Sequence, residues 1–169
     1  MTLKVAVNKS PSQFSRRHLE HDWLQYLKAL GIPASNLVVE ITEGLLLDAS
    51  PQVSDKLLEY RDAGIQVAID DFGTGYSSMA YLQKFDIDYL KIDQSFVRDI
   101  PAHKGNCTIA ETIIVMAHKL GLKVIAEGIE TQAQCDFLTQ AGCDYGQGYF
   151  YSCPVPADQV EHLLSRHLP

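Results

Sequence analysis

The chain has 169 residues, of which 46% are hydrophobic and 21% charged, as is typical of a soluble globular domain. Its formal net charge of -7 argues against binding to DNA or RNA, which requires a basic surface. No apolar run approaches the roughly 18 residues of a membrane-spanning helix, and the N-terminus lacks the pattern of a signal peptide. We therefore expect this polypeptide to lie in the cytoplasm. The expectation is the same if the polypeptide is part of a membrane-anchored parent protein.

Strands and helices alternate along the predicted chain. Runs rich in β-branched residues predict five strands and a weaker sixth, at Leu3–Val7, Leu37–Ile41, Ile65–Ile69, Tyr89–Ile92, Lys123–Ala126 and Tyr145–Phe150. Apolar residues at helical spacing fill the intervals, and glycines that can cap helix ends follow them at Gly31, Gly64, Gly121 and Gly142. Thr131 and Gln134 have the spacing of a capping box, which predicts a helix start.

This alternation predicts an α/β fold with a mainly parallel sheet, either doubly wound or closed into a barrel. A doubly wound nucleotide-binding fold should have a glycine-rich turn after its first strand. Here Asn8-Lys9-Ser10-Pro11 follows that strand, so a barrel is favoured. Eight strand–helix units typically need about 250 residues. Because only about six units are visible, we expect an incomplete TIM barrel that lacks two units at its front.

Polar residues stand at or just beyond the carboxyl-terminal ends of the predicted strands. They are Asn8, Glu40, Glu43, Asp70, Asp71, Lys91, Asp93, Glu127, Glu130 and Gln147. Each has an ordinary explanation when taken alone, such as capping the next helix or forming a turn. In a parallel barrel, however, all these strand ends converge on one rim, which is where the active site lies.

Carboxylates gathered at one rim repel each other unless protonation or a cation relieves the repulsion. Oxygen ligands without Cys or His suit Mg²⁺ or Mn²⁺ rather than zinc. The doublet Asp70-Asp71 could serve two ions about 4 Å apart, an arrangement that recurs in phosphodiester hydrolysis. Lys91 would then neutralise phosphate or position the attacking water. The bare pattern also fits a metal-dependent lyase with a Lys-x-Asp motif.

The remaining candidate ligands are interpreted as structural. The six histidines fall on predicted helices or loops, away from the strand ends, and are interpreted as surface or packing residues. The four cysteines form no CxxC pair and no zinc-like spacing, so we expect reduced thiols in a cytosolic protein.

Six segments in this order closely resemble the motifs of EAL domains, which are bacterial phosphodiesterases specific for cyclic-di-GMP. They are VNKS, EITE, DDFGTGYSS, DYLKIDQSFV, AEGIET and QGYFYSCPVP. The resemblance covers essentially the whole chain, so residues 1–169 are identified as one EAL domain, truncated at its N-terminus. It implies a modified TIM barrel with an inverted first strand, and conversion of cyclic-di-GMP to pGpG with Mg²⁺ or Mn²⁺.

By motif, the resemblance implies that Asn8, Glu40 and Asp70 are ligands of one metal ion. Asp71 would serve a second ion and count among the catalytic residues. Lys91 resembles the lysine that orients water and phosphate, and Glu127 resembles the catalytic glutamate, acting as general base or as a metal-linked residue.

The resemblance also implies supporting residues and a partner. Glu43 resembles a glutamate that braces the loop Phe72–Ser78, which in the family couples dimerisation to activity. We therefore expect a homodimer through this loop and the neighbouring helix. Glu130, Gln147 and Asp93 are interpreted as supporting or substrate-binding residues.

The chain departs from the family pattern in three places. It lacks the Glu-Ala-Leu signature, so the first metal ion is expected to be one protein ligand short. Lys9 replaces an apolar residue that usually follows the metal-binding asparagine, which we expect to matter little. Cys153 stands where an arginine is common, which is expected to weaken contacts to guanine or phosphate.

Two alternatives to hydrolysis follow from these departures. One is a non-catalytic module that binds cyclic-di-GMP without cleaving it. The other is an inactive barrel fragment that self-associates, because open sheet edges and exposed core invite pairing with another chain.

Overall fold

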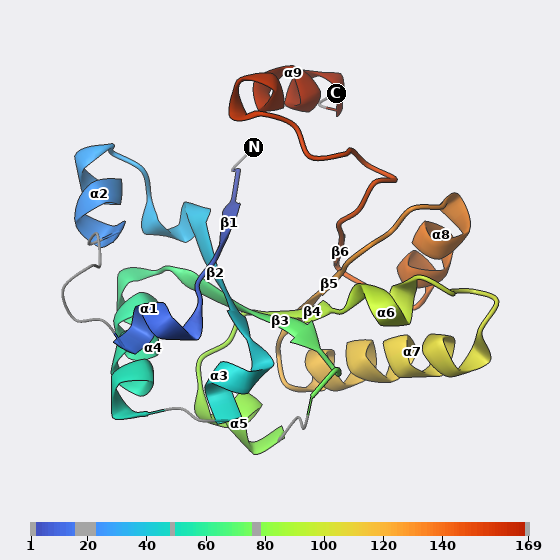
Figure 1. Cartoon of the computed structure of the whole chain (residues 1–169), viewed down its shortest axis with the longest axis horizontal. Coiled ribbons are helices and arrows are strands. Elements are labelled where there is room, and N and C mark those ends of the chain that lie inside the picture. Colours follow the sequence, from blue (N-terminus) through green and yellow to red (C-terminus); the bar gives the residue numbers. More distant parts are fainter. Residues whose placement is uncertain (1–2, 16–22, 48–49, 76–78, 168–169) are drawn as a thin grey trace.

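A single parallel sheet organises the part of the chain that the computed structural model describes, which is residues 3–15, 23–47, 50–75 and 79–167. The strands are β1 (Val5–Asn8), β2 (Leu37–Thr42), β3 (Gln66–Phe72), β4 (Tyr89–Ile92), β5 (Lys123–Ala126) and β6 (Tyr145–Gly146). Each strand is hydrogen-bonded in parallel to the next one in the sequence (Figure 1). A doubly wound sheet would reverse this order partway. The predicted incomplete barrel is therefore confirmed, with β1 and β6 at the edges of the described sheet.

The helices connect successive strands, except for α9, which follows β6. Their bounds are α1 (Pro11–Ser15), α2 (Trp23–Ala29), α3 (Glu43–Leu47), α4 (Pro51–Ala63), α5 (Met79–Lys84), α6 (Gln94–Val97), α7 (Lys104–Lys119), α8 (Gln132–Gln140) and α9 (Ala157–His167), with a 3-10 turn at Ala34–Asn36. The capping box of α8 forms as predicted between Thr131 and Gln134. Within the described ranges, none of these helices is both long and apolar enough to cross a membrane.

The two faces of the sheet bury different residues, and this alternation positions the site. Side chains on the outer face, such as Val39, Val67 and Val124, join the large core cluster that the helices cover. The inner face carries a smaller cluster of Val38, Ala68 and Tyr89, with Ile125 packed against it. Because strand side chains alternate, the residue two positions further along each strand lies on the same inner face.

Four strands differ from their predicted bounds. The first runs from Val5 to Asn8 rather than from Leu3 to Val7, and the second extends one residue further, to Thr42. The third strand does not end before the acidic doublet but continues through it to Phe72. The sixth strand was predicted to reach Phe150, and this was wrong, because regular pairing ends at Gly146. Beyond it the chain folds against the segment after β5, where the Phe150 N–H donates to the Ile129 carbonyl at 2.9 Å.

Asp144 joins the start of β6 to β5 and α7. Its Oδ2 accepts from the Val124 N–H at 2.8 Å and lies 2.8 Å from His118 Nε2. Burial would raise the pKa of Asp144, but hydrogen bonds from His118 and Val124 outweigh it and lower the pKa. A carboxylate with a lowered folded-state pKa stabilises the fold above its unfolded pKa of about 3.9, and this contribution is lost as the pH falls through the folded pKa.

Replacing Asp144 with Asn is therefore expected to lower the free energy of unfolding by about 0.5–1 kcal/mol at pH 7, since the pair is partly screened by solvent. The difference from the unchanged chain should shrink as the pH falls below about 4. Urea unfolding at pH 7 and at lower pH measures both quantities. A difference that is equally large at low pH would contradict this role.

Candidate active site

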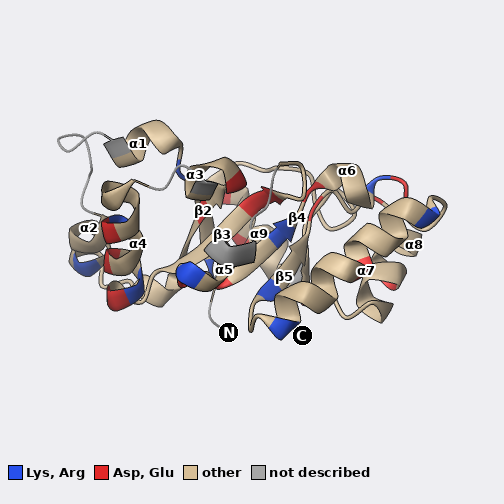
Figure 2. Ribbon diagram, turned by 90° about the horizontal axis from the view of Figure 1, so that it is seen from below, with Lys and Arg blue, Asp and Glu red and all other residues tan. Residues whose placement is uncertain are grey.

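Lys91 lies at the centre of the polar residues on the inner face. Its Nζ contacts Glu40 Oε2 at 2.9 Å, Asp70 Oδ1 at 2.8 Å and Glu127 Oε1 at 2.6 Å. These side chains come from β2, β3, β4 and the residue after β5, and only 3% of the Lys91 side chain is exposed. Red segments of β2 and β3 accordingly lie near the blue segment of β4 in Figure 2. Three of the predicted rim carboxylates therefore meet around a fourth predicted residue, the buried Lys91 ammonium.

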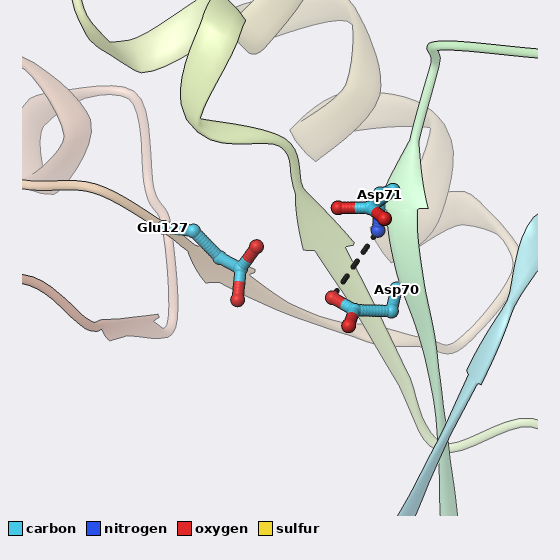
Figure 3. Close-up of side chains that lie close together, drawn as sticks. All are labelled: Asp70, Asp71 and Glu127. Carbon is cyan, nitrogen blue, oxygen red and sulfur yellow. Dashed lines mark hydrogen bonds between the residues drawn. The ribbon is translucent and has the colours of Figure 1, made fainter. Parts of the chain in front are cut away.

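An irregularity in β3 brings both residues of the acidic doublet to the rim. Neighbouring residues of a regular strand point to opposite faces of the sheet. The pairing of β3 with β4 shifts register between Ile69 and Phe72, and Asp71 has a φ of 55°. As a result, ligand oxygens of Asp70, Asp71 and Glu127 lie within 4.8 Å of one another (Figure 3). The Asp71 N–H also donates to Asp70 Oδ1 at 3.2 Å.

The ionisation of this cluster reflects burial and crowding. Burial would lower the pKa of Lys91, but hydrogen bonds to Asp70, Glu127 and Glu40 outweigh it and raise the pKa above its usual range. Burial also raises the pKa of Glu127, and the charges of Asp70 and Glu40 add to that rise, although Lys91 opposes it. Lys91 therefore stays protonated at neutral pH, whereas Glu127 takes up a proton more readily than an exposed glutamate.

Asp93 extends the acidic cluster from the N-terminus of α6. It caps this helix through the Ser95 N–H, which donates to Asp93 Oδ1 at 2.8 Å. The pKa of Asp71 is raised by burial, by the charge of Asp70 and by a hydrogen bond with Asp93. Burial acts in the same direction on Asp93, but its hydrogen bonds to Ser95 and Asp71 lower its pKa. Two carboxylates held this close favour a cation beside them.

Three further predicted residues, like Asp71 and Asp93, lie outside the salt bridges around Lys91. Asn8 is exposed at the end of β1, where it pairs in register with Glu40. Gln147 is exposed just after β6, and its N–H donates to the Ala126 carbonyl at 2.8 Å. Glu130 is also exposed, and its N–H donates to Gln134 Oε1 at 2.8 Å. Asn8 is the last residue of β1, and Gln147 and Glu130 follow β6 and β5, at the same end of the sheet as the cluster.

Glu43 is the first residue of α3 and is buried beneath the loop that follows β3. Its Oε2 accepts from the Gly73 N–H at 3.2 Å. A Cβ at Gly75 would lie 3.0 Å from Glu43 Oε1, and one at Gly73 would lie 3.0 Å from the Phe96 ring. The loop therefore packs closely on Glu43 and α6. The last part of the predicted dimer loop, residues 76–78, lies outside the described residues.

Lys9 has a structural role that sequence reasoning missed. Its side chain is buried, and Nζ donates to Tyr60 Oη at 2.6 Å and lies 4.5 Å from the centre of the Phe14 ring. Lys9 thereby links the end of β1 to α1 and α4. Its signal in the sequence is weak, because a lysine after a strand end ordinarily indicates an exposed loop.

His103 and His118 contact groups other than the carboxylates around Lys91. His103 accepts from the Asn106 N–H at the start of α7, and His118 pairs with Asp144. His18 and His21 lie outside the described residues.

The chemistry of the donor set fits a divalent cation. Asp70, Asp71 and Glu127 offer hard oxygen ligands close enough for one ion to bind all three. Acidic groups outnumber Lys91 in this cluster, so a further positive charge would be stabilised there. Glu40, Asp70 and Asn8 lie along the neighbouring strand ends, where they could contribute to a second position.

Known proteins are similar to this chain in both sequence and fold. The sequence model of the EAL domain family matches residues 1–154. Cyclic di-GMP phosphodiesterase NbdA of Pseudomonas aeruginosa is 44% identical over 162 residues, which are 96% of this chain and 21% of NbdA. The chain therefore spans about a fifth of the length of that relative.

Solved structures also match. The PaMucR phosphodiesterase in complex with c-di-GMP matches with a TM-score of 0.86 and 35% identity, over 93% of this chain and 64% of that one. A manganese and c-di-GMP complex of Klebsiella pneumoniae BlrP1 matches with a TM-score of 0.82 and 31% identity, over 90% of this chain and 39% of that one. The chain thus belongs to the EAL domain family.

Proposed function

We propose that this protein hydrolyses cyclic-di-GMP to linear pGpG with Mg²⁺ or Mn²⁺, in bacterial second-messenger signalling in the cytoplasm. The observation that carries this proposal is the buried Lys91 ammonium among the carboxylates of Glu40, Asp70 and Glu127, with Asp71 beside them. The relatives support it, since NbdA is named a cyclic di-GMP phosphodiesterase and the PaMucR and BlrP1 complexes contain c-di-GMP. Residues 1–169 would belong to the catalytic EAL domain.

The metal ligands would be Asn8, Glu40 and Asp70 for one ion and Asp71 for the second. Bound there, two divalent ions would polarise the scissile phosphate and lower the pKa of an attacking water. Manganese in the BlrP1 complex supports a divalent ion, as does the oxygen-only donor set of this chain.

The protein side chains would position the reactants and move the proton. Glu127 would accept the proton of the attacking water, and its raised pKa makes it a better base than an exposed glutamate. Because Lys91 stays charged, it would stabilise the negative charge that develops on the phosphate. Forming pGpG adds one water and breaks one phosphorus–oxygen bond to a ribose 3′ oxygen. Glu130, Gln147 and Asp93 would contact substrate or support this rim.

The proposal is tested by incubating the folded chain with cyclic-di-GMP and MnCl₂ and separating the nucleotides by liquid chromatography. Linear pGpG should accumulate, and a chelator should stop the reaction. Binding of cyclic-di-GMP in calorimetry without product would instead support a non-catalytic binding module. A well-folded chain that neither binds nor cleaves the nucleotide would contradict the proposal.

Glu43 offers a test of how the rim is held in place. Replacing Glu43 with Ala removes the acceptor of the Gly73 N–H and the group on which the loop after β3 packs. We expect hydrolysis to fall about 10- to 100-fold, as is typical when groups supporting a metal site are lost. Steady-state kinetics measure this effect. Glu59→Ala, an exposed glutamate on α4, should keep full activity, and equal losses in both variants would contradict the role of Glu43.

We also propose a homodimer through the loop Phe72–Ser78 and the neighbouring helix. Gly73 packs against Phe96 and Ile113, so the described part of this loop lies against α6 and α7. On α7, Val115 is exposed and lines a shallow depression together with Met116 and Leu120. Light scattering should give twice the monomer mass, and a monomer at all concentrations would contradict this proposal.

A further inference from the structure

All the hydrogen-bond donors of the Lys91 side chain are directed to carboxylates. A lysine ammonium carries three N–H donors. Glu40, Asp70 and Glu127 each place one oxygen within 2.9 Å of Lys91 Nζ. With these contacts intact, Lys91 has no donor left to offer a phosphate or a water.

Two of these carboxylates also belong to the group that could hold a metal ion. Asp70 and Glu127 contact Lys91, and both offer ligand oxygens to a common position with Asp71. The ammonium and a divalent ion would therefore neutralise the same negative charges. Because both would contact the same carboxylates, the ammonium and the ion would lie close together, and positive charges that close repel strongly in a buried site.

We propose that Lys91 is a built-in counter-ion that stabilises this cluster without metal and competes with the divalent ion for Asp70 and Glu127. Metal binding loosens at least one of the contacts to Lys91 and thereby frees an N–H donor for the phosphate. Lys91 thus has a free N–H donor for the phosphate only when metal is bound. It lowers the affinity for metal and stabilises the metal-free fold. This inference rests on the proposed metal site.

The test uses the whole chain, stripped of metal, and the variant Lys91→Met, which has a similar length and no charge. Without metal, breaking a buried ion-pair cluster should lower the melting temperature by about 10 °C. Isothermal titration with MnCl₂ should show about tenfold or greater tightening of the dissociation constant, because a nearby positive charge is gone. The rise in melting temperature on adding MnCl₂ should be larger in the variant than in the unchanged chain.

Lys123→Met is the matched control. It makes the same change in net charge at the first residue of β5, whereas Glu127 of the cluster follows the last residue of that strand. Lys123 is exposed, and its Nζ donates to Tyr145 Oη at 3.4 Å. Its manganese affinity should equal that of the unchanged chain. Equal tightening in both variants would indicate a general charge effect and overturn the proposal.

The outcomes separate this inference from the proposed function. If the unchanged chain binds Mn²⁺ and Lys91→Met binds it no more tightly, the inference fails and the metal site stands. If neither binds Mn²⁺, both fail. Should Lys91→Met be unfolded without metal, circular dichroism decides: folding on addition of MnCl₂ supports the inference, and a chain that stays unfolded at saturating MnCl₂ overturns it.

Discussion

Replacing Asp70 with Asn is expected to lower the rate of cyclic-di-GMP hydrolysis by about a thousandfold, equivalent to about 4 kcal/mol of lost charge stabilisation. Asp70 and Glu127 both contact Lys91 and share the candidate metal position with Asp71, and Asp70 also accepts a hydrogen bond from the Asp71 N–H. An amide keeps the shape of the side chain but removes its charge, so metal affinity falls with the rate. Initial rates of pGpG formation at several MnCl₂ concentrations measure both effects.

The matched control is Asp62→Asn, which makes the same chemical change on α4. Asp62 is exposed and pairs with Arg61 on α4, ahead of the first residue of β3, whereas Asp70 lies near the other end of that strand. This variant should retain the full rate. The melting temperature of Asp70→Asn should stay close to that of the unchanged chain, since one of several crowded negative charges is removed. Activity in Asp70→Asn within about tenfold of the unchanged chain would contradict its proposed role.

Replacing Gly148 with Ala is expected to lower the free energy of unfolding by about 3 kcal/mol or more. A Cβ at this position would overlap the backbone oxygen and nitrogen of Ile129, which are not free to rotate away. Ile129 is itself held by Gln147, whose carbonyl accepts from its N–H at 3.1 Å. The segment after β6 must therefore separate from the segment after β5. Urea unfolding followed by circular dichroism measures the loss.

Gly121→Ala distinguishes this clash from ordinary backbone strain. Gly121 follows α7 with a φ of 79°, and a Cβ there would meet no atom within 4 Å. Only the left-handed conformation opposes the substitution, so the expected loss is about 1 kcal/mol. Similar losses at the two positions would show that the close approach to Ile129 is unimportant.

The fold and the convergence of the site could be predicted because both follow from simple periodicities. Alternating strands and helices, without a glycine-rich turn after the first strand, indicated a barrel-type sheet. Parallel strands place their carboxyl ends at one edge, and this predicted the meeting of Glu40, Asp70, Lys91 and Glu127. Because side chains alternate along a strand, these four residues share the inner face with the apolar residues two positions earlier, which are Val38, Ala68, Tyr89 and Ile125.

The remaining features depend on tertiary contacts that no local pattern encodes. Strand alternation alone would place Asp70 and Asp71 on opposite faces, and only the register shift with a positive φ at Asp71 brings them together. The sixth strand stops early because Gly148 packs against Ile129, a neighbour supplied by the turn after β5. Lys9 is buried because its ammonium contacts the Tyr60 hydroxyl and the Phe14 ring, which lie on two different helices, α4 and α1.

Crystals grown with MnCl₂ and measured at the manganese absorption edge would show whether the carboxylates around Lys91 bind the divalent metal ions proposed for phosphodiester hydrolysis. We expect an anomalous peak about 2.0–2.4 Å from carboxylate oxygens of Asp70 and Asp71, with at least one contact of Lys91 lengthened. Manganese bound only elsewhere, with all three contacts of Lys91 unchanged, would contradict this expectation.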